Sequence, residues 1–364
     1  MYAFIEGILA EEAGKLGLKN ISAHNARVYF EADEYGVALA NVFLRTADRV
    51  YIILGEFEAR SFEYLFENIR KIDFADIIPS DARLPVNANA VQSQLMSIND
   101  IRAVAKKAVV KSLQRTYRME LFPENGSTFN IYVNLFKDRA TIALNTSGQG
   151  LNRRGYRLKN AEAPLKETLA AALILISRWH SRDFYDPMCG SGTIAIEATM
   201  IAADMAPGLR RVFDAQCYSN KFKKAFSDIK EYANNKVKKP QMEIFAGDID
   251  AKSIKFAQEH ARNMGLENII NFYVDDVVKF KQPANPASII SNPPYAIRLG
   301  EKREVERLYE SLGKTFLHLE DTVFFLLSAN DCFERLLGSK ADKKRKLYNG
   351  NIQCVYYQYF RRRG

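Results

Sequence analysis

Five short apolar runs in the second half of the chain alternate with segments of helical periodicity, and this alternation strongly constrains the fold. The runs begin near residues 183, 242, 270, 287 and 322. Such alternation predicts a mainly parallel sheet with right-handed crossovers and helices on its faces. Because the carboxyl ends of parallel strands meet at one edge of a sheet, the residues that follow these runs are expected to share a site.

The end of the chain departs from this pattern. Two strand-like runs, residues 345–348 and 351–360, flank the dipeptide Asn349-Gly350. Asn-Gly between two such runs predicts a hairpin with a type I′ turn. We therefore expect a parallel sheet that is closed by an antiparallel hairpin.

The run near residue 183 ends in a Gly-rich turn that opens a helix, D-P-M-C-G-S-G-T. Two glycines permit a tight turn and a close approach of backbone to a ligand. The third Gly of a dinucleotide motif is replaced by Ala195, and no basic residue follows for a phosphate. An acid before the turn suits a cationic amino group, so the pattern favours S-adenosylmethionine. The candidate cofactor residues here are Asp186, Pro187, Cys189, Gly190, Ser191, Gly192 and Thr193.

Acidic residues follow the next two apolar runs. Asp250 closes G-D-I-D, where a carboxylate can accept both ribose hydroxyls of a nucleoside. Asp276 follows the run from Ile270 and is expected to accept from an adenine amino group. The neighbours Ile249 and Val277 complete the predicted cofactor site.

The run that begins near residue 287 ends in Asn292-Pro293-Pro294-Tyr295, which is typical of enzymes that methylate a planar exocyclic or amide nitrogen. The lone pair of such a nitrogen is delocalised. An amide oxygen and a backbone carbonyl can accept its N–H groups, and a Tyr ring can stack on the planar target. The prolines lock φ, and we expect their carbonyls to lack competing local donors. These four residues are the candidate catalytic group.

Together these motifs make the chain similar to the class I methyltransferases. Two further features narrow the resemblance to the THUMP-domain RNA guanine-N2 methyltransferases that modify bacterial large-subunit ribosomal RNA: residues 151–157 together with 163–169, and residues 346–350. It covers nearly the whole chain. It implies an α/β fold: a Rossmann-like methyltransferase domain with a mainly parallel seven-stranded sheet and a C-terminal antiparallel hairpin, preceded by α+β ferredoxin-like and THUMP modules. It also implies S-adenosylmethionine as cofactor and RNA as partner.

The net charge of +9 is concentrated in two regions. Residues 335–364 hold nine Lys or Arg and one acid, and residues 101–118 hold six and none. Concentrated positive charge points to a polyanion, although a solvated helix face is the simpler alternative. At helical spacing four cations share one face, opposite Ala105, Val109 and Ser112, and three more follow in the linker. The candidate RNA-binding residues are Lys107, Lys111, Arg115, Arg118, Arg153, Arg154 and Arg157.

The expected domain boundaries follow the composition and the element pattern. We predict a ferredoxin-like module at 1–58, with its first strand short or missing, and a THUMP RNA-binding module at 59–146. A linker rich in Gly, Asn and Arg spans 147–160, and the methyltransferase domain spans 161–364. Within that last domain, residues 206–240 form a long insertion of helical character to which the sequence assigns no role.

Composition excludes several other classes. The four cysteines are scattered without a CxxC pair, which gives neither a zinc site nor a disulfide framework and suits a reducing cytoplasm. No apolar stretch is long enough to span a bilayer, and no signal peptide is visible. Methyl transfer from a sulfonium needs no metal, so none is expected. The chain is expected to be a cytoplasmic monomer or weak dimer.

Alternative functions of three kinds stay open at this point. The asparagine–proline motif also occurs in adenine-N6 DNA and glutamine-N5 protein methyltransferases, although the basic faces disfavour both. Transfer RNA is the alternative to ribosomal RNA as substrate. A third possibility, from a different class, is a non-catalytic RNA-binding assembly factor, against which the intact site residues argue.

Overall fold

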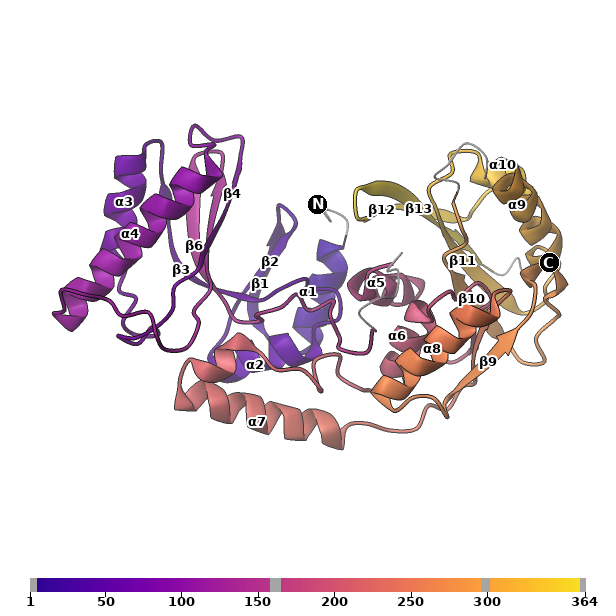
Figure 1. Cartoon of the computed structure of the whole chain (residues 1–364). Helices are drawn as coiled ribbons and strands as arrows, with labels where there is room; N and C mark the ends of the chain where they lie inside the picture. Colours follow the sequence, from indigo (N-terminus) through magenta and orange to yellow (C-terminus); the bar gives the residue numbers. More distant parts are fainter. Residues whose placement is uncertain (1–4, 158–164, 296–301, 361–364) are drawn as a thin grey trace.

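The computed structural model describes residues 5–157, 165–295 and 302–360. Three parts follow one another along an elongated molecule (Figure 1). A four-stranded sheet with two helices lies at one end, a small helical module with a two-stranded hairpin lies in the middle, and a seven-stranded sheet flanked by helices forms the other end.

The middle module is built from the first residues of the chain. Two helices flank a β-hairpin, in the order α1 (Glu6–Lys15), β1 (Lys19–His24), β2 (Arg27–Glu31) and α2 (Glu34–Phe43). Asp33 caps α2, since its carboxylate accepts from the backbone N–H of Gly36 at 2.9 Å. Within the described residues, which begin at Ile5, the module has a two-stranded sheet, and the expectation that its first strand is short or missing stays a prediction.

The four-stranded sheet has the order β3-β6-β5-β4, and two helices cover the face that is turned away from the seven-stranded sheet (Figure 1). Its elements are β3 (Tyr51–Glu58), α3 (Phe62–Lys71), β4 (Val86–Val91), α4 (Ile98–Tyr117), β5 (Ile131–Phe136) and β6 (Arg139–Asn145). β3 pairs with β6 and therefore belongs to this sheet. The predicted boundary between the first two modules, after residue 58, falls at the end of β3 rather than before it. Lys137 and Asp138 join β5 to β6 with φ of 51° and 61°, as a type I′ turn requires.

The seven-stranded sheet has the order β12-β13-β11-β10-β7-β8-β9, and only its β13 pairings are antiparallel. Its strands are β7 (Asp183–Asp186), β8 (Ile244–Asp248), β9 (Ile270–Val274), β10 (Ala287–Ser291), β11 (Thr322–Ser328), β12 (Lys343–Asn349) and β13 (Ile352–Tyr359). The helices are α5 (Glu167–Ser177), α6 (Thr193–Ala202), α7 (Asn220–Asn235), α8 (Ala251–Met264), α9 (Lys302–Phe316) and α10 (Phe333–Leu337), with short η1 (Asp214–Cys217) and η2 (Val277–Lys279). The mainly parallel sheet with a C-terminal antiparallel hairpin is as predicted.

The turn of that hairpin differs in one detail from the sequence expectation. Asn349 pairs with Ile352, so Gly350 and Asn351 are the two turn residues rather than Asn349 and Gly350. Gly350 has φ of 62° and is the first central residue, which is the position of glycine in a type II′ turn. The prediction of type I′ was therefore wrong, because the pairing register starts one residue later than the Asn-Gly signal suggests.

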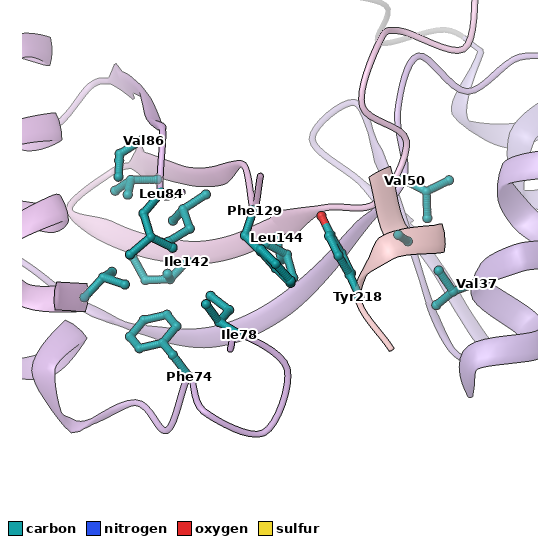
Figure 2. Close-up of a cluster of buried hydrophobic side chains, with 14 of the residues drawn as sticks. Val37, Val50, Phe74, Ile78, Leu84, Val86, Phe129, Ile142, Leu144 and Tyr218 are labelled. Carbon is teal, nitrogen blue, oxygen red and sulfur yellow. The ribbon is translucent and has the colours of Figure 1, made fainter. Parts of the chain in front are cut away.

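The insertion at residues 206–240 attaches the seven-stranded domain to the two N-terminal parts. Its α7 packs along α2, and its Tyr218 stacks on Phe129 with ring centroids 4.5 Å apart. Figure 2 shows Tyr218 pointing into the cluster of buried side chains beside the four-stranded sheet. Asp214 adds a polar tie, accepting from the Asn130 amide at 2.7 Å. The insertion therefore has a structural role: it packs the seven-stranded domain against the two N-terminal parts.

Candidate active site

The predicted motifs meet at one edge of the seven-stranded sheet. β7 lies between β8 and β10, so the chain reverses its direction of winding at β7. In open α/β sheets, ligands bind outside the carboxyl ends of the strands at such a point. Asp186 ends β7, Asp248 ends β8, and Asn292 follows β10. Asp186 and Ser291 touch directly across the strands, because the Ser291 hydroxyl donates to Asp186 Oδ1 at 2.5 Å.

The Gly-rich turn is shaped to bring backbone close to a ligand. Gly190 and Gly192 have φ of 50° and 79°. A Cβ on Gly192 would lie 2.8 Å from Ala257 Cβ, so this glycine lets α8 pack against the turn. A Cβ on Gly190 would meet no atom within 4 Å, so this position faces open space. Cys189 anchors the turn by donating from its backbone N–H to the Gly247 carbonyl at 2.8 Å.

Asp186, which precedes the Gly-rich turn, is a buried acid with one unpaired carboxylate oxygen. Its side chain is 1% exposed, and Oδ2 has no hydrogen-bond partner among the described residues. Burial raises the pKa of this carboxyl to about 7, helped by the nearby Asp248 charge and opposed by the Ser291 hydrogen bond. A buried carboxylate oxygen without a partner is costly unless a ligand satisfies it. The cationic amino group of S-adenosylmethionine fits this oxygen.

Two acids lie at the end of β8, Asp248 within the strand and Asp250 after it, and the sequence motifs predicted only Asp250 as a cofactor residue. Asp250 is exposed and caps α8, accepting from the backbone N–H of Lys252 and from both donors of Ser253. Asp248 lies nearer to the Gly-rich turn, since its Oδ2 accepts from the Gly190 N–H at 2.9 Å. Either carboxylate can accept a ribose hydroxyl. Asp248 could have been found from its position, because it is the last residue of β8 and side chains at the carboxyl ends of parallel strands face the ligand site.

The end of β9 borders a hollow of about 380 Å³. Pro187, Asp276 and Val277, all predicted cofactor residues, line it together with aromatic side chains that include Tyr273. Ile249, on the neighbouring strand end, is 68% exposed, which is unusual for a large apolar residue and suits stacking on a planar ring. The residues present thus offer an acid, an apolar platform and an open backbone turn to the predicted cofactor.

The Asn292–Tyr295 turn presents one free acceptor. Asn292 Oδ1 is buried without a hydrogen-bond partner among the described residues. The Tyr295 hydroxyl accepts from the Asn349 amide at 2.7 Å, which ties the turn to β12. The Pro294 carbonyl already accepts from the Tyr309 hydroxyl at 2.9 Å. Tyr309 is distant in sequence, so this contact does not contradict the expectation that the proline carbonyls lack competing local donors; it shows that the Pro294 carbonyl is occupied from elsewhere in the fold.

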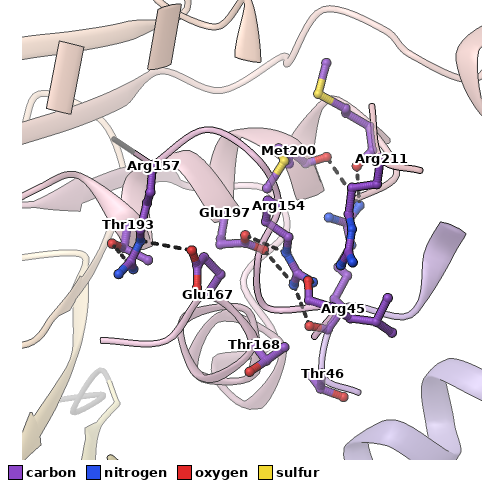
Figure 3. Close-up of polar contacts among 12 residues, drawn as sticks. Arg45, Thr46, Arg154, Arg157, Glu167, Thr168, Thr193, Glu197, Met200 and Arg211 are labelled. Atoms are coloured by element: carbon purple, nitrogen blue, oxygen red, sulfur yellow. Dashed lines mark hydrogen bonds and ion pairs between the residues drawn. The ribbon is translucent and has the colours of Figure 1, made fainter. Parts of the chain in front are cut away.

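Two of the linker arginines are structural. Arg154 is 1% exposed and pairs with the buried Glu197 of α6 at 3.1 Å, while its guanidinium also donates to the Arg45 carbonyl (Figure 3). Arg157 pairs with Glu167 at 2.9 Å and donates to the Thr193 hydroxyl at the start of α6. The predicted phosphate contact of Arg154 was therefore wrong, because its guanidinium group is buried at the domain junction, whereas a phosphate contact of Arg157, whose side chain is 15% exposed, stays a prediction.

The other predicted RNA-binding residues are exposed. Lys107, Lys111 and Arg115 lie on the solvent side of α4, opposite the buried Ala105 and Val109, as the helical spacing predicted. Lys107 and Lys111 line a shallow hollow of about 650 Å³ between α4 and β4. Arg118 follows as the C-cap of α4, and Arg153 is exposed in the linker. Their contact with RNA stays a prediction.

The strand order, the turn after β7 and the acids after β8 and β9 define a class I S-adenosylmethionine-dependent methyltransferase. Across residues 154–358 the chain matches the family described as RMKL-like, methyltransferase domain, and it belongs to that family. Residues 4–51 match the RlmL ferredoxin-like domain and residues 59–145 the THUMP domain. The resemblance inferred from the motifs is thereby confirmed.

Named relatives agree with this assignment. The chain is 40% identical over 363 residues to the "Putative RNA methyltransferase YpsC" of Bacillus subtilis (strain 168), covering 98% of this chain and 93% of that one. It is 32% identical to the "Ribosomal RNA large subunit methyltransferase K/L" of Vibrio campbellii (strain ATCC BAA-1116), over 98% of this chain. The chain spans about half the length of that second relative, 52%.

Solved structures support both the fold and the cofactor. A "possible methylase" from Clostridium difficile 630 has a TM-score of 0.94 and 41% identity, covering 98% of this chain and 95% of the other. "SMU.472, a putative methyltransferase complexed with SAH" has a TM-score of 0.95 and 37% identity, covering 100% and 97%. SAH is S-adenosylmethionine without its methyl group, so the cofactor of this chain is S-adenosylmethionine.

Residues 5–157, 165–295 and 302–360, which the structure describes, hold neither a membrane-spanning helix nor a metal-binding cluster. They contain no helix that is long and apolar enough to cross a membrane. In the same ranges no three His, Cys, Asp or Glu side chains gather as a metal ion would require.

Proposed function

We propose that this methyltransferase transfers a methyl group to the exocyclic N2 of a guanine in RNA, with 23S ribosomal RNA as the target. The observation that carries the proposal is Asn292 Oδ1, a buried acceptor without a partner among the described residues, at the strand end beside the cofactor turn. An exocyclic amine supplies the N–H that such an acceptor needs. The names of the relatives support RNA as the substrate class.

The chain's own residues then have defined tasks. Asn292 Oδ1 and the Pro293 carbonyl would accept the two amine N–H groups and orient the nitrogen lone pair towards the methyl carbon. Tyr295 would stack on the guanine, which must leave its base stack to reach the site. S-adenosylmethionine supplies the methyl: the N–C bond forms as the C–S bond breaks, the electron pair stays on sulfur, and the amine proton leaves to solvent. No protein nucleophile is needed.

Two surfaces are proposed to dock the RNA. One is the exposed cationic side of α4, which lies on the outer face of the four-stranded sheet. The second surface is the opposite face of the four-stranded sheet, which borders a hollow of about 610 Å³ between that sheet and the β1–β2 hairpin. Tyr51 and Tyr132 lie there with ring centroids 5.3 Å apart, and Arg49 lines the same hollow. Aromatic rings beside a cation are what unpaired nucleotides need.

The direct test is transfer of a tritiated methyl group into RNA from a strain that lacks this gene. Ribosomal and transfer RNA are separated first, and labelled nucleosides are then identified by chromatography and mass spectrometry. Label in N2-methylguanosine of 23S RNA is expected. Label in N6-methyladenosine would overturn the guanine assignment, and label confined to transfer RNA would overturn the target.

The remaining alternatives have their own outcomes in the same assay. Label in DNA or in protein glutamine would replace RNA as the substrate class. Cofactor binding without transfer to any nucleic acid would favour a non-catalytic RNA-binding assembly factor. The unfilled acceptor of Asn292 speaks for turnover, because a protein that binds cofactor and RNA without methyl transfer has no need to keep it.

A further inference from the structure

A chain of hydrogen bonds ends on the backbone of the Asn292–Tyr295 turn. The Tyr309 hydroxyl of α9 lies 2.9 Å from the Pro294 carbonyl and 3.0 Å from the Ser328 hydroxyl at the end of β11. Ser328 Oγ in turn accepts from the backbone N–H of Asn330 at 3.1 Å. Tyr309 is 0% exposed and Ser328 is 1% exposed, so both hydroxyl groups lie inside the domain, whereas Pro294 itself lies at its surface.

The donors and acceptors in this chain have one consistent direction. The Asn330 N–H can only donate and the Pro294 carbonyl can only accept. Tyr309 therefore donates its proton to Pro294, and Ser328 donates its own to Tyr309 Oη. Burial raises the pKa of Tyr309 to about 12, so the phenol keeps its proton at any working pH. Hydrogen bonds that run in one direction through a buried region strengthen one another.

We propose that Tyr309 is a positioning residue for methyl transfer: by holding the Pro294 carbonyl, its hydroxyl sets the place of Asn292 Oδ1 and of the Tyr295 ring. This inference rests on the proposed function. Asn349, at the end of β12, holds the same turn by donating to the Tyr295 hydroxyl. The catalytic turn is thus fixed from two sides by residues that lie outside its motif.

The turn depends on such outside contacts because of its composition. Neither Pro293 nor Pro294 has a backbone N–H, so the turn lacks two of the donors with which a loop usually ties itself down. A carbonyl held by a distant phenol replaces them. Transfer between two bound groups is sensitive to small misplacements, since its advantage comes from correct orientation. Loss of the Tyr309 contact should therefore lower the rate of the chemical step.

The test compares two substitutions of the same kind in one domain. Tyr309→Phe removes the hydroxyl that holds Pro294. Tyr356→Phe removes an equally buried hydroxyl, which donates at 3.1 Å to the Leu173 carbonyl, outside the turn. Single-turnover methyl transfer is measured on total RNA from a strain that lacks this gene, with SAH affinity by calorimetry and the midpoint of thermal unfolding in parallel.

Tyr309→Phe is expected to slow the single-turnover rate about three- to tenfold, the size of one lost hydrogen bond, with SAH affinity unchanged. Tyr356→Phe is expected to lower the unfolding midpoint to a similar extent while the rate stays at the wild-type value. Equal rates for wild type and Tyr309→Phe, or equal slowing by both variants, would overturn the proposal, since the second result marks a general loss of stability.

A second variant tests the direction of the chain. Ser328→Ala removes the donor behind Tyr309, so it is expected to slow transfer less than Tyr309→Phe does. The double variant should be no slower than Tyr309→Phe alone, because both changes act through one contact. Additive losses would refute the relay. If wild-type protein methylates no RNA, the proposed function fails, and that result is distinct from every comparison between these variants.

Discussion

The pKa of Asp186 makes cofactor binding depend on pH in a calculable way. Asp186 must be ionised to pair with the cationic amino group of S-adenosylmethionine, yet burial raises its pKa to about 7 in the free protein. Below that pH, binding must first remove a proton. With one such proton, the apparent affinity scales with the ionised fraction, so it should fall about 25-fold from pH 7.5 to pH 5.5.

The same shift has an opposite effect on the stability of the free protein. A carboxyl whose folded pKa lies above its ordinary value of 3.8 stabilises the fold fully below that pH. This contribution is lost as pH rises towards 7, and it amounts to about 4 kcal/mol at most. A rise in pH should therefore lower the free energy of unfolding of the cofactor-free protein while it increases the affinity for cofactor. A rise in the unfolding midpoint on adding cofactor should be larger at pH 7.5 than at pH 5.5.

Isothermal titration calorimetry with SAH in two buffers of different ionisation enthalpy measures both affinity and proton release. About half a proton should be released at pH 7. Asp186→Asn keeps the shape but cannot titrate, so its affinity should be weaker and nearly flat over the same range. His260, whose ring lies 3.0 Å from the Ser191 carbonyl, is retained in the variant and controls for other titrating groups. A flat wild-type profile, or an equally steep one in Asp186→Asn, would refute the reasoning.

Three further predictions follow from the same site and from α4. Asn292→Ala should slow methyl transfer by about two to three orders of magnitude with SAH affinity nearly unchanged, as measured by single-turnover kinetics and calorimetry; loss of affinity with a normal rate would contradict this role. Asp250→Ala and Asp248→Ala should be compared for SAH affinity, and the acid that meets the ribose should cost about tenfold or more when removed; if neither does, the ribose assignment fails. Replacing Lys107 and Lys111 with Ala should flatten the log–log salt dependence of RNA binding by about one to two units, and an unchanged slope would mean that these lysines only solvate the helix.

Local patterns predicted the elements well because each depends on neighbours in sequence. The strands that begin at Asp183, Ile244, Ile270, Ala287 and Thr322 lie where the apolar runs of the sequence predicted them. The hairpin at Gly350 shows the limit of this approach. Its dipeptide signal was correct, but the pairing register is set by how β12 and β13 pack, which moved the turn by one residue.

The sequence by itself determined the order of the motifs, the class of fold and the chemistry of the strand ends. Those features depend on residue type and on spacing along the chain. Only the tertiary structure decided which charged side chains are exposed and able to meet RNA, because burial depends on contacts between segments that are distant in sequence. Arg154 and Arg153 are adjacent in the linker, yet one pairs with Glu197 inside the domain junction and the other faces solvent. Tyr309, which carries no sequence signal, became a support of the catalytic turn only when α9 packed against it.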